Sequence, residues 1–205
     1  SRDWSSDVCS ADLVSRNTAL FCPKRSNVFI ANKDLSNLLN QALKYIPDSK
    51  KGLPQEAFYF VSQLTPMINV DLLVKNRKGQ SLLTWRDDQF YGPAWHIPGG
   101  IIRFKEKIED RIKKVAENEL GCRVKFDAKP LDIREMMNKE RDIRGHFISI
   151  LYLCEIVGEP EESKKSLDNN PQSGQWAWHD LAPHNLISVH EPFRKFINAV
   201  NQNYL

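Results

Sequence analysis

A Gly-Gly pair followed by an amphipathic helix constrains this 205-residue chain more than any other stretch of its sequence. Glycine tolerates dihedrals and contacts that a Cβ atom forbids, so Gly99 and Gly100 let the backbone approach a ligand closely. Beyond them, the spacing of apolar residues predicts a helix with one buried row, formed by Ile108, Ile112 and Val115. A glycine turn therefore lies next to a helix that packs on the core.

Glu119 continues this apolar row. A carboxylate at such a position is costly to remove from water unless it pairs with a cation or binds a metal. Nearby acids such as Glu109 and Glu117 fall on the solvated face instead. Gly121 is expected to end the helix, which starts near Lys107, as its C-cap. The segment thus presents one inward carboxylate beside a Gly-Gly turn, in the order that a metal-diphosphate site needs.

The segment Trp95–Cys122 resembles the Nudix box in the spacing of its glycines, acids and bases. The positions that fall on the pattern are Gly100, Glu106, Lys114, Glu119 and Gly121. Two of the family's acidic positions hold Val115 and Asn118 instead. Ordinary members use the acidic cluster to hold two or more divalent ions and hydrolyse a diphosphate at phosphorus. One branch, the GDP-mannose mannosyl hydrolases, keeps only the last Glu and cleaves the sugar C–O bond; this chain is similar to that branch over roughly residues 66–180.

The resemblance implies a site for Mg²⁺ (or Mn²⁺) and a nucleotide sugar. Its metal ligands would be the carbonyl of Gly99, the carboxylate of Glu119 and the side chain of Gln172. Asp71 and Arg86 fall on positions that contact the nucleotide sugar, and Arg86 would steady the diphosphate leaving group. Because positions 115 and 118 carry no acid, a single ion is expected, with substrate phosphates completing its oxygen ligands.

Two departures from the branch concern the substrate and the general base. The arginine that follows the family's Gly-Gly pair is replaced by Ile101, and Arg103 is close enough to substitute for it. The family's catalytic histidine is replaced by Ser173, whose hydroxyl does not titrate near neutrality. His146 begins a strand where the mannosyl hydrolases also carry a histidine, so it is the first alternative base. Further candidates are Asp168, His179 and His190.

Glu106 has a structural role in the resemblance. It would form an ion pair with the basic residue that matches Lys114 and so orient the helix. The family carries an arginine at that position. A lysine keeps the charge but loses the bidentate fork, so the predicted pair is looser.

Bulk composition limits the classes of function. With 41% hydrophobic and 27% charged residues, the chain has the composition of a globular protein with one well-buried core. A net charge of +3 suits a small anionic substrate but does not indicate a nucleic-acid-coating protein. The longest apolar run is too short to cross a bilayer. Four cysteines without CxxC spacing indicate neither zinc nor a disulfide framework, so we expect a cytoplasmic protein without nucleic-acid or membrane partners.

Three segments are expected along the chain. Residues 1–14 lack periodicity and resemble the translated read-through of a sequencing adapter, so they are left out of fold reasoning. Residues 15–65 form an N-terminal helical arm, with one helix over Asp34–Ile46, capped by Asn32 or Asp34, and a second that starts at Pro54. The arm either packs on its own domain or forms a homodimer contact. Residues 66–205 form the Nudix domain.

Strand patterns within the domain favour the α/β class. The expected strands are 67–74, 80–86, 123–135 and 145–157. Residues 158–174 are expected to form a mobile surface loop, and a terminal helix should run from about Pro192 to Val200. The resemblance implies a Nudix α/β/α sandwich with a mixed sheet.

The sequence is compatible with three functions. The leading hypothesis is a magnesium-dependent hydrolase that cleaves the glycosyl C–O bond of a nucleoside diphosphate sugar. The second is a pyrophosphohydrolase that cleaves a P–O bond. The third is a non-catalytic module that binds nucleotide sugars.

Overall fold

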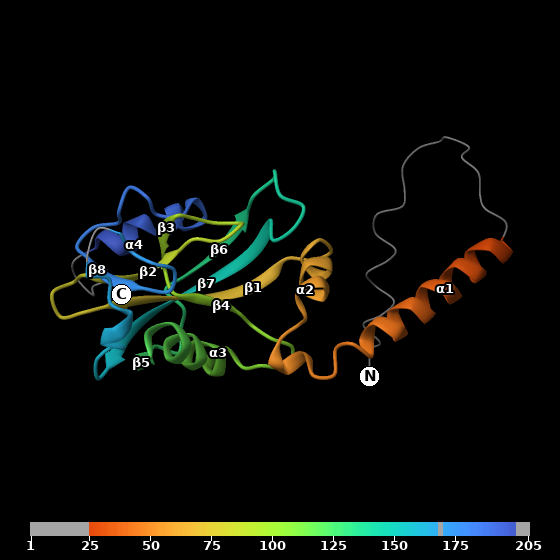
Figure 1. Ribbon diagram of the computed structural model, residues 1–205, viewed down its shortest axis with the longest axis horizontal. Helices are drawn as coiled ribbons and strands as arrows, with labels where there is room; N and C mark the ends of the chain where they lie inside the picture. The colour runs from red at the N-terminus through yellow and green to blue at the C-terminus, as the bar shows by residue number, and fades with distance from the viewer. Residues whose placement is uncertain (1–24, 168–169, 200–205) are drawn as a thin grey trace. The chain divides into compact units, whose positions relative to one another are not determined.

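The computed structural model describes residues 25–167 and 170–199 (Figure 1). The described chain divides into two units after Pro47. The first unit contains helix α1 (Arg25–Leu43). The predicted start of this helix is wrong, because Asn32 and Asp34 lie inside α1 instead of capping it. No proline or glycine occurs between Arg25 and Asp34 to interrupt the helix. The segment 1–14 lies outside the described residues.

The second unit is built around a mixed β-sheet. Its central strand β1 (Met67–Lys75) runs parallel to β7 (His146–Val157) and antiparallel to β2 (Ser81–Arg86) and β4 (Gly99–Ile101). The remaining strands are β3 (Ala94–His96), β5 (Arg123–Phe126), β6 (Asp132–Met137) and β8 (Trp176–His179). The main path of the sheet follows the order β3-β2-β1-β7-β5. This arrangement confirms the predicted α/β class with a mixed sheet.

Helices cover both faces of the sheet, which gives the three layers expected of an α/β/α sandwich (Figure 1). Successive β1 side chains point to opposite faces. Val70, Leu72 and Val74 therefore pack with α3 (Ile108–Val115) and the π-helical turn η2 (Ala116–Leu120). Leu73 packs on the opposite face with η4 (Ser188–Phe193) and α4 (Arg194–Asn198). Those last two elements occupy most of the predicted terminal helix.

The predicted strand over residues 123–135 is wrong in extent, because two strands replace it. Phe126 of β5 pairs with Cys154, and Asp132 of β6 pairs with Leu151. Both strands therefore pair with the same long strand, β7. Pro130 lies in the break and has no N–H to donate to a sheet. The short strands β3, β4 and β8 are not among the predicted strands. The predicted loop over 158–174 contains a 3₁₀ turn, η3 (Glu162–Lys164).

Helix α2 (Gln55–Ser62) belongs to the second unit and packs beside two of its loops. It follows a 3₁₀ turn, η1 (Ser49–Lys51), and Pro54 occupies its N-cap. The Tyr59 hydroxyl accepts a 2.7 Å hydrogen bond from Gln89 in the β2–β3 loop. The Ser62 hydroxyl accepts a 3.2 Å bond from the backbone N–H of Arg144 in the β6–β7 loop. Among the described helices, none is long and apolar enough to span a membrane.

Candidate active site

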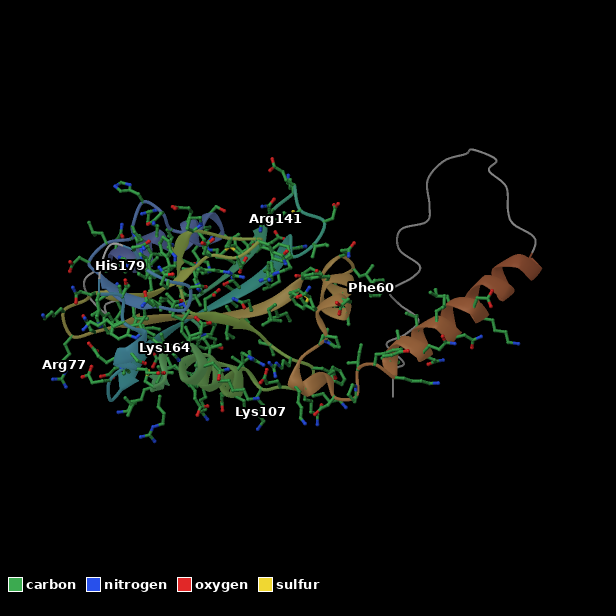
Figure 2. The ribbon with its side chains drawn as sticks, viewed as in Figure 1. Phe60, Arg77, Lys107, Arg141, Lys164 and His179 are labelled. Atoms are coloured by element: carbon green, nitrogen blue, oxygen red, sulfur yellow. The ribbon has the colours of Figure 1, made fainter. Side chains whose placement is uncertain are left out.

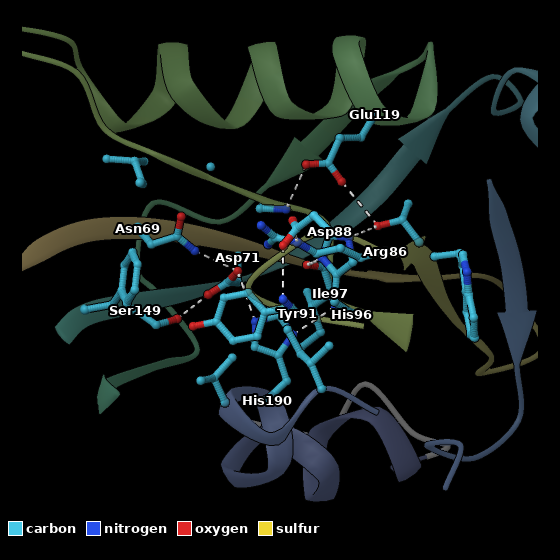
Figure 3. Close-up of a pocket in the computed structure, with 18 of the residues that line it drawn as sticks. Asn69, Asp71, Arg86, Asp88, Tyr91, His96, Ile97, Glu119, Ser149 and His190 are labelled. Carbon is cyan, nitrogen blue, oxygen red and sulfur yellow. Dashed lines mark hydrogen bonds and ion pairs between the residues drawn. The ribbon is translucent and has the colours of Figure 1, made fainter. Parts of the chain in front are cut away.

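A cavity of about 510 Å³ opens between β1, β2, η4 and the turn η2 that follows α3 (Figure 3). This volume lies in the range of small-molecule sites. Its polar and charged lining residues are Asn69, Asp71, Thr84, Arg86, Asp88, Tyr91, His96, Asn118, Glu119, Arg144, Ser149, Lys164, Ser173 and His190. The apolar lining residues are Trp85, Ile97, Ile101, Met136, Phe147, Ile187 and Val189.

Glu119 reaches the cavity from the π-helical turn that follows α3. Ala116 and Leu120 are fully buried and anchor this turn, while Gly121 ends it with a left-handed φ of 64° as the predicted C-cap. One carboxylate oxygen of Glu119 accepts a 3.3 Å bond from the Gly99 N–H, and the other accepts a 3.2 Å bond from the Thr84 hydroxyl. Burial, with a smaller effect from the Asp71 charge, raises the pKa of Glu119 to about 7.

The Gly-Gly pair allows close contacts with the protein itself. Gly99 pairs with Asp71 across β4 and β1, and a Cβ atom on Gly99 would lie 2.2 Å from the Asp71 carboxylate. A Cβ atom on Gly100 would lie 2.8 Å from a Val115 methyl group. Real Cβ atoms do not approach so closely, so both positions require glycine. The sequence indicated close approach to a ligand, and the structure shows close approach to Asp71 and α3.

Asp71 forms the centre of a buried polar cluster (Figure 3). Its Oδ1 accepts a 2.8 Å bond from the Asn69 amide, and its Oδ2 accepts a bond from the Ser149 hydroxyl. His190 Nε2 lies 3.6 Å from Oδ1. Burial raises the pKa of Asp71 to about 6, although the two hydrogen bonds oppose this shift. Sequence reasoning missed Asn69 and Ser149, which are direct partners in the parallel β1–β7 register.

Two histidines beside this cluster are held in fixed orientations by Ile97. Nδ1 of His190 accepts a 3.0 Å bond from the Ile97 N–H, while Nδ1 of His96 donates a 2.9 Å bond to the Ile97 carbonyl. Burial is the main cause that lowers the pKa of each to about 3, so both rings are neutral at pH 7. The lone pair of neutral His190 is already engaged, which makes this ring a poor base in its observed setting.

Arg86 lines the cavity at the end of β2. Its Nε donates a 2.5 Å bond to Asp88, and its guanidinium lies 4.9 Å from the centre of the Tyr91 ring. Asp88 is itself fixed, since its second oxygen accepts backbone N–H bonds from Phe90 and Tyr91. These contacts hold a positive guanidinium at the cavity wall in a defined position.

The cavity lining does not include four residues that the sequence suggested as ligands or bases: Arg103, His146, Gln172 and His179. The exposed Gln172 side chain donates to a backbone carbonyl two residues earlier. Arg103 donates a 3.4 Å bond to the Lys50 carbonyl. His146 lies 3.0 Å from the Glu135 carboxylate on the sheet surface.

Other sequence candidates have mixed placements. Ser173, next to Gln172, does line the cavity. His179 lies against the Trp95 ring, with the centres 4.6 Å apart. Asp168 falls outside the described residues. From the predicted set, the structure therefore brings together at the cavity Asp71, Arg86, Gly99, Gly100, Glu119, Ser173 and His190.

Glu106 lies at the opposite end of the box helix and is held by three neighbours. Lys114 donates a 2.9 Å bond to one oxygen, and the Arg111 guanidinium donates bonds of 2.5 and 2.8 Å to the other. The backbone N–H of Arg103 adds a 3.0 Å bond. Although burial raises it, these bonds lower the pKa of Glu106 to about 2. The prediction of a looser ion pair considered Lys114 alone and is therefore incomplete. Arg111 supplies the guanidinium fork that a lysine lacks.

A protein-family model described as the NUDIX domain matches residues 65–200, which is more than half of the chain. The chain belongs to the Nudix domain family. The model covers the sheet, the box helix and the cavity. It begins after helix α2, so this helix is an addition to the Nudix match.

Two curated relatives match parts of this Nudix domain. The low-salt glycan biosynthesis protein Agl8 of Haloferax volcanii is 27% identical over 93 residues, which are 45% of this chain and 58% of that protein. The ADP-ribose pyrophosphatase of Methanocaldococcus jannaschii is 25% identical over 95 residues, 46% of this chain and 54% of that protein. The chain thus spans just over half the length of these relatives.

Solved structures agree on the Nudix fold. The MutT Nudix hydrolase from Burkholderia pseudomallei superposes with a TM-score of 0.50 and 20% sequence identity, covering 65% of this chain and 96% of that one. At that identity the likeness shows the fold alone. It supports the sandwich architecture described above.

The Nudix acidic cluster is reduced in this chain. Val115 is buried in the core, and the exposed Asn118 accepts a bond from Lys164 through its backbone carbonyl. Within residues 25–167 and 170–199, no three His, Cys, Asp or Glu side chains gather as a metal-binding group. Glu119 is the box carboxylate that faces the cavity.

Proposed function

We propose that this Nudix domain is a divalent-metal-dependent hydrolase of nucleoside diphosphate sugars that cleaves the glycosyl C–O bond. One observation supports it above the others: Glu119 faces a ligand-sized cavity next to Gly99, while the family's other acidic positions hold Val115 and Asn118. Mg²⁺ is commonly held by one or two carboxylates together with substrate phosphates. A single carboxylate therefore suits an ion that the diphosphate itself helps to bind.

The residues present fit such an ion. No lysine, arginine or histidine in the described part of the chain forms a salt bridge with Glu119, and its buried carboxylate accepts bonds only from neutral donors. A nearby divalent cation would favour the ionised form of this carboxylate. Glu119 and the Gly99 carbonyl are the proposed ligands at the cavity, and Mg²⁺ or Mn²⁺ bound there would stabilise negative charge on the diphosphate. Gln172, the third ligand that the resemblance implies, does not line the cavity and donates to a backbone carbonyl instead.

Arg86 is the proposed contact for the leaving group. Asp88 and Tyr91 hold its guanidinium at the cavity wall before any ligand arrives. A preorganised cation stabilises the charge that develops on a departing diphosphate without reorganising as the bond breaks. The C–O bond breaks, the electron pair stays on the diphosphate oxygen, and water supplies the hydroxyl of the free sugar.

Asp71 is the proposed general base. It lines the cavity, lies beside Gly99, and has a pKa near 6, which suits proton removal from water at neutral pH. Ser173 also lines the cavity, but its hydroxyl needs a base of its own. His146 is less well placed, since it pairs with Glu135 on the sheet surface. Asn69 and Ser149 would orient Asp71 and the bound sugar.

The second candidate function is hydrolysis of a P–O bond in an ADP-ribose-like substrate. The similarity to a protein named ADP-ribose pyrophosphatase favours it. Both reactions use the same diphosphate and the same metal, so the bond that breaks has to be measured.

Isotope transfer from water separates the two reactions. The full chain would be incubated with Mg²⁺ in oxygen-18 water, using GDP-, UDP-, dTDP-, CDP- and ADP-sugars and ADP-ribose as substrates. We expect the label in the free sugar. Label in a nucleotide phosphate would replace the proposal with the P–O reaction. Binding without turnover of any substrate would indicate a non-catalytic module.

A further inference from the structure

Three cationic side chains line the cavity: Arg86, Arg144 and Lys164. Arg86 is 2.5 Å from Asp88, and Lys164 is 2.9 Å from Glu161, so each has a carboxylate neighbour. Across the two described ranges, no carboxylate forms a salt bridge with Arg144, and its buried Nε has no hydrogen-bond partner. Arg144 therefore brings a positive charge to the cavity that the protein does not neutralise.

Arg144 is held in place by a backbone hydrogen bond and by aromatic rings. Its backbone has a left-handed φ of 55°, unusual for a residue with a side chain, and its N–H donates to Ser62 of helix α2. Its guanidinium lies 4.8 Å from the centre of the Phe90 ring and 5.6 Å from that of Phe58. Aromatic contacts of this kind use the face of a guanidinium and leave its in-plane N–H donors available.

The setting of Arg144 is electrostatically unfavourable without a ligand. Burial, together with the charge of Arg86, lowers the pKa of the Arg144 guanidinium below its ordinary value. An arginine stays charged in proteins, so the two like charges facing one cavity repel each other. An anion between them would remove that repulsion and form charge-assisted hydrogen bonds.

We propose that Arg144 binds a phosphate group of the substrate directly, as a second anion-binding residue beside Arg86, so that the cavity selects diphosphates over monophosphates. This proposal takes the identity of the anion from the proposed function, but it does not depend on turnover. Helix α2 thereby contributes to the site, because Phe58 and Ser62 orient Arg144.

Arg141 provides a matched control. It lies in the same loop, its guanidinium is 4.5 Å from the Tyr91 ring centre, and it donates to the Phe90 carbonyl. Like Arg144 it contacts the β2–β3 loop, at the Tyr91 ring and the Phe90 carbonyl, but it is not among the residues that line the cavity. A change at Arg141 therefore tests the loop without touching the ligand.

Calorimetric titration of the full chain tests the proposal, with ADP, GDP and UDP and the matching monophosphates as ligands in Mg²⁺ buffer. Arg144→Gln should raise the Kd of the bound diphosphate roughly 10- to 100-fold, as expected for a lost charge-assisted bond. Its effect on the monophosphate should be about tenfold smaller. Arg144→Lys should fall between, since it keeps the charge but not the fork. Arg141→Gln should stay within about threefold of the unaltered protein.

Each result bears on the proposal separately from catalysis. A diphosphate Kd for Arg144→Gln within threefold of the unaltered protein, or equal losses for Arg144→Gln and Arg141→Gln, would overturn it. Equal losses for diphosphate and monophosphate would also overturn it, as would the absence of diphosphate binding to the unaltered chain. Selective loss in Arg144→Gln without turnover of any nucleotide sugar would support this proposal while removing the proposed function.

Discussion

Glu106 and Glu119 lie at opposite ends of the same helical segment, and their surroundings differ in one respect. Glu106 accepts bonds from two cationic side chains, Arg111 and Lys114. Among the described residues, Glu119 accepts bonds only from Gly99 and Thr84, which are neutral. The protein therefore neutralises the first charge and leaves the second exposed to the cavity. A carboxylate with its own cations stabilises the fold, while one without them is suited to an external cation.

The pKa values of the two groups diverge for this reason. That of Glu106 falls to about 2 from its ordinary value of 4.5, although burial opposes the fall, and that of Glu119 rises to about 7 because of burial. Asp71 resembles Glu119, since its hydrogen-bond donors Asn69 and Ser149 are neutral and its pKa rises to about 6. The comparison predicts functional losses from changes at Glu119 and Asp71 and a stability loss from changes at Glu106.

The largest effect is expected for Glu119→Gln. The amide keeps the shape of the side chain but removes the charge proposed to hold the metal, so metal-dependent kcat/KM should fall by roughly 1000-fold. Thermal melting without metal should show no loss of Tm, because an uncompensated buried charge is removed. Steady-state kinetics with Mg²⁺ and Mn²⁺ measures the first effect. Unchanged activity would exclude Glu119 as a metal ligand.

Asp71→Asn should lower kcat by about 100-fold, the range for loss of a general base. In the unaltered protein the rate should rise as pH increases through about 6, since the base acts when deprotonated, and this limb should vanish in the variant. His146→Asn is the control, and its rate should stay within about threefold because His146 lies outside the cavity lining. A larger loss in His146→Asn than in Asp71→Asn would move the base to His146.

Glu106→Gln should reduce the free energy of unfolding by about 3 kcal/mol, because it leaves the buried Arg111 guanidinium without its carboxylate. Urea denaturation at pH 7 measures this loss. The folded variant should retain its affinity for Mg²⁺, since Glu106 does not line the cavity. A stability change below about 0.5 kcal/mol would place Glu106 among ordinary surface acids.

The same variant tests how the stability contribution of Glu106 depends on pH. A carboxylate whose folded pKa is depressed adds stability above its unfolded value of about 4.5, and this contribution is lost as pH falls through the folded value of about 2. The difference between the unaltered protein and Glu106→Gln should therefore be full at pH 7 and shrink between pH 4.5 and 2. A difference that is constant over this range would show that charge is not its source.

Local patterns predicted much of the box segment, while long-range pairing determined the rest of the site. The buried Ile112 and Val115 and the left-handed Gly121 follow from helical spacing and glycine chemistry alone. Asn69 and Ser149 meet only because β1 and β7 pair in parallel, a register that residues 80 positions apart do not reveal. His190 likewise lies near Asp71 although η4 is far from β1 in the sequence.

The partner of Glu106 predicted from the family pattern was Lys114, and Arg111 was not predicted. Arg111 lies one helical turn before Lys114. Its side chain is 7% exposed, nearly as buried as that of Glu106, which is 5% exposed. A motif gives the positions of residues and not the depth of their side chains. That depth decides which of two cations contributes more to stability.

The smallest effects should distinguish these two cations. Lys114 is 48% exposed, so Lys114→Gln should cost about 0.5 kcal/mol, as surface ion pairs do. Arg111→Lys should cost more, about 1–2 kcal/mol, because the variant keeps the charge but loses one of two bonds in a buried pair. Urea denaturation of both variants and of their combinations with Glu106→Gln gives the pairwise energies by double-mutant cycles. Equal losses of unfolding free energy at the two positions would show that burial does not make Arg111 contribute more than Lys114. The contrast between Glu106 and Glu119 would then depend only on the number of cations around each carboxylate.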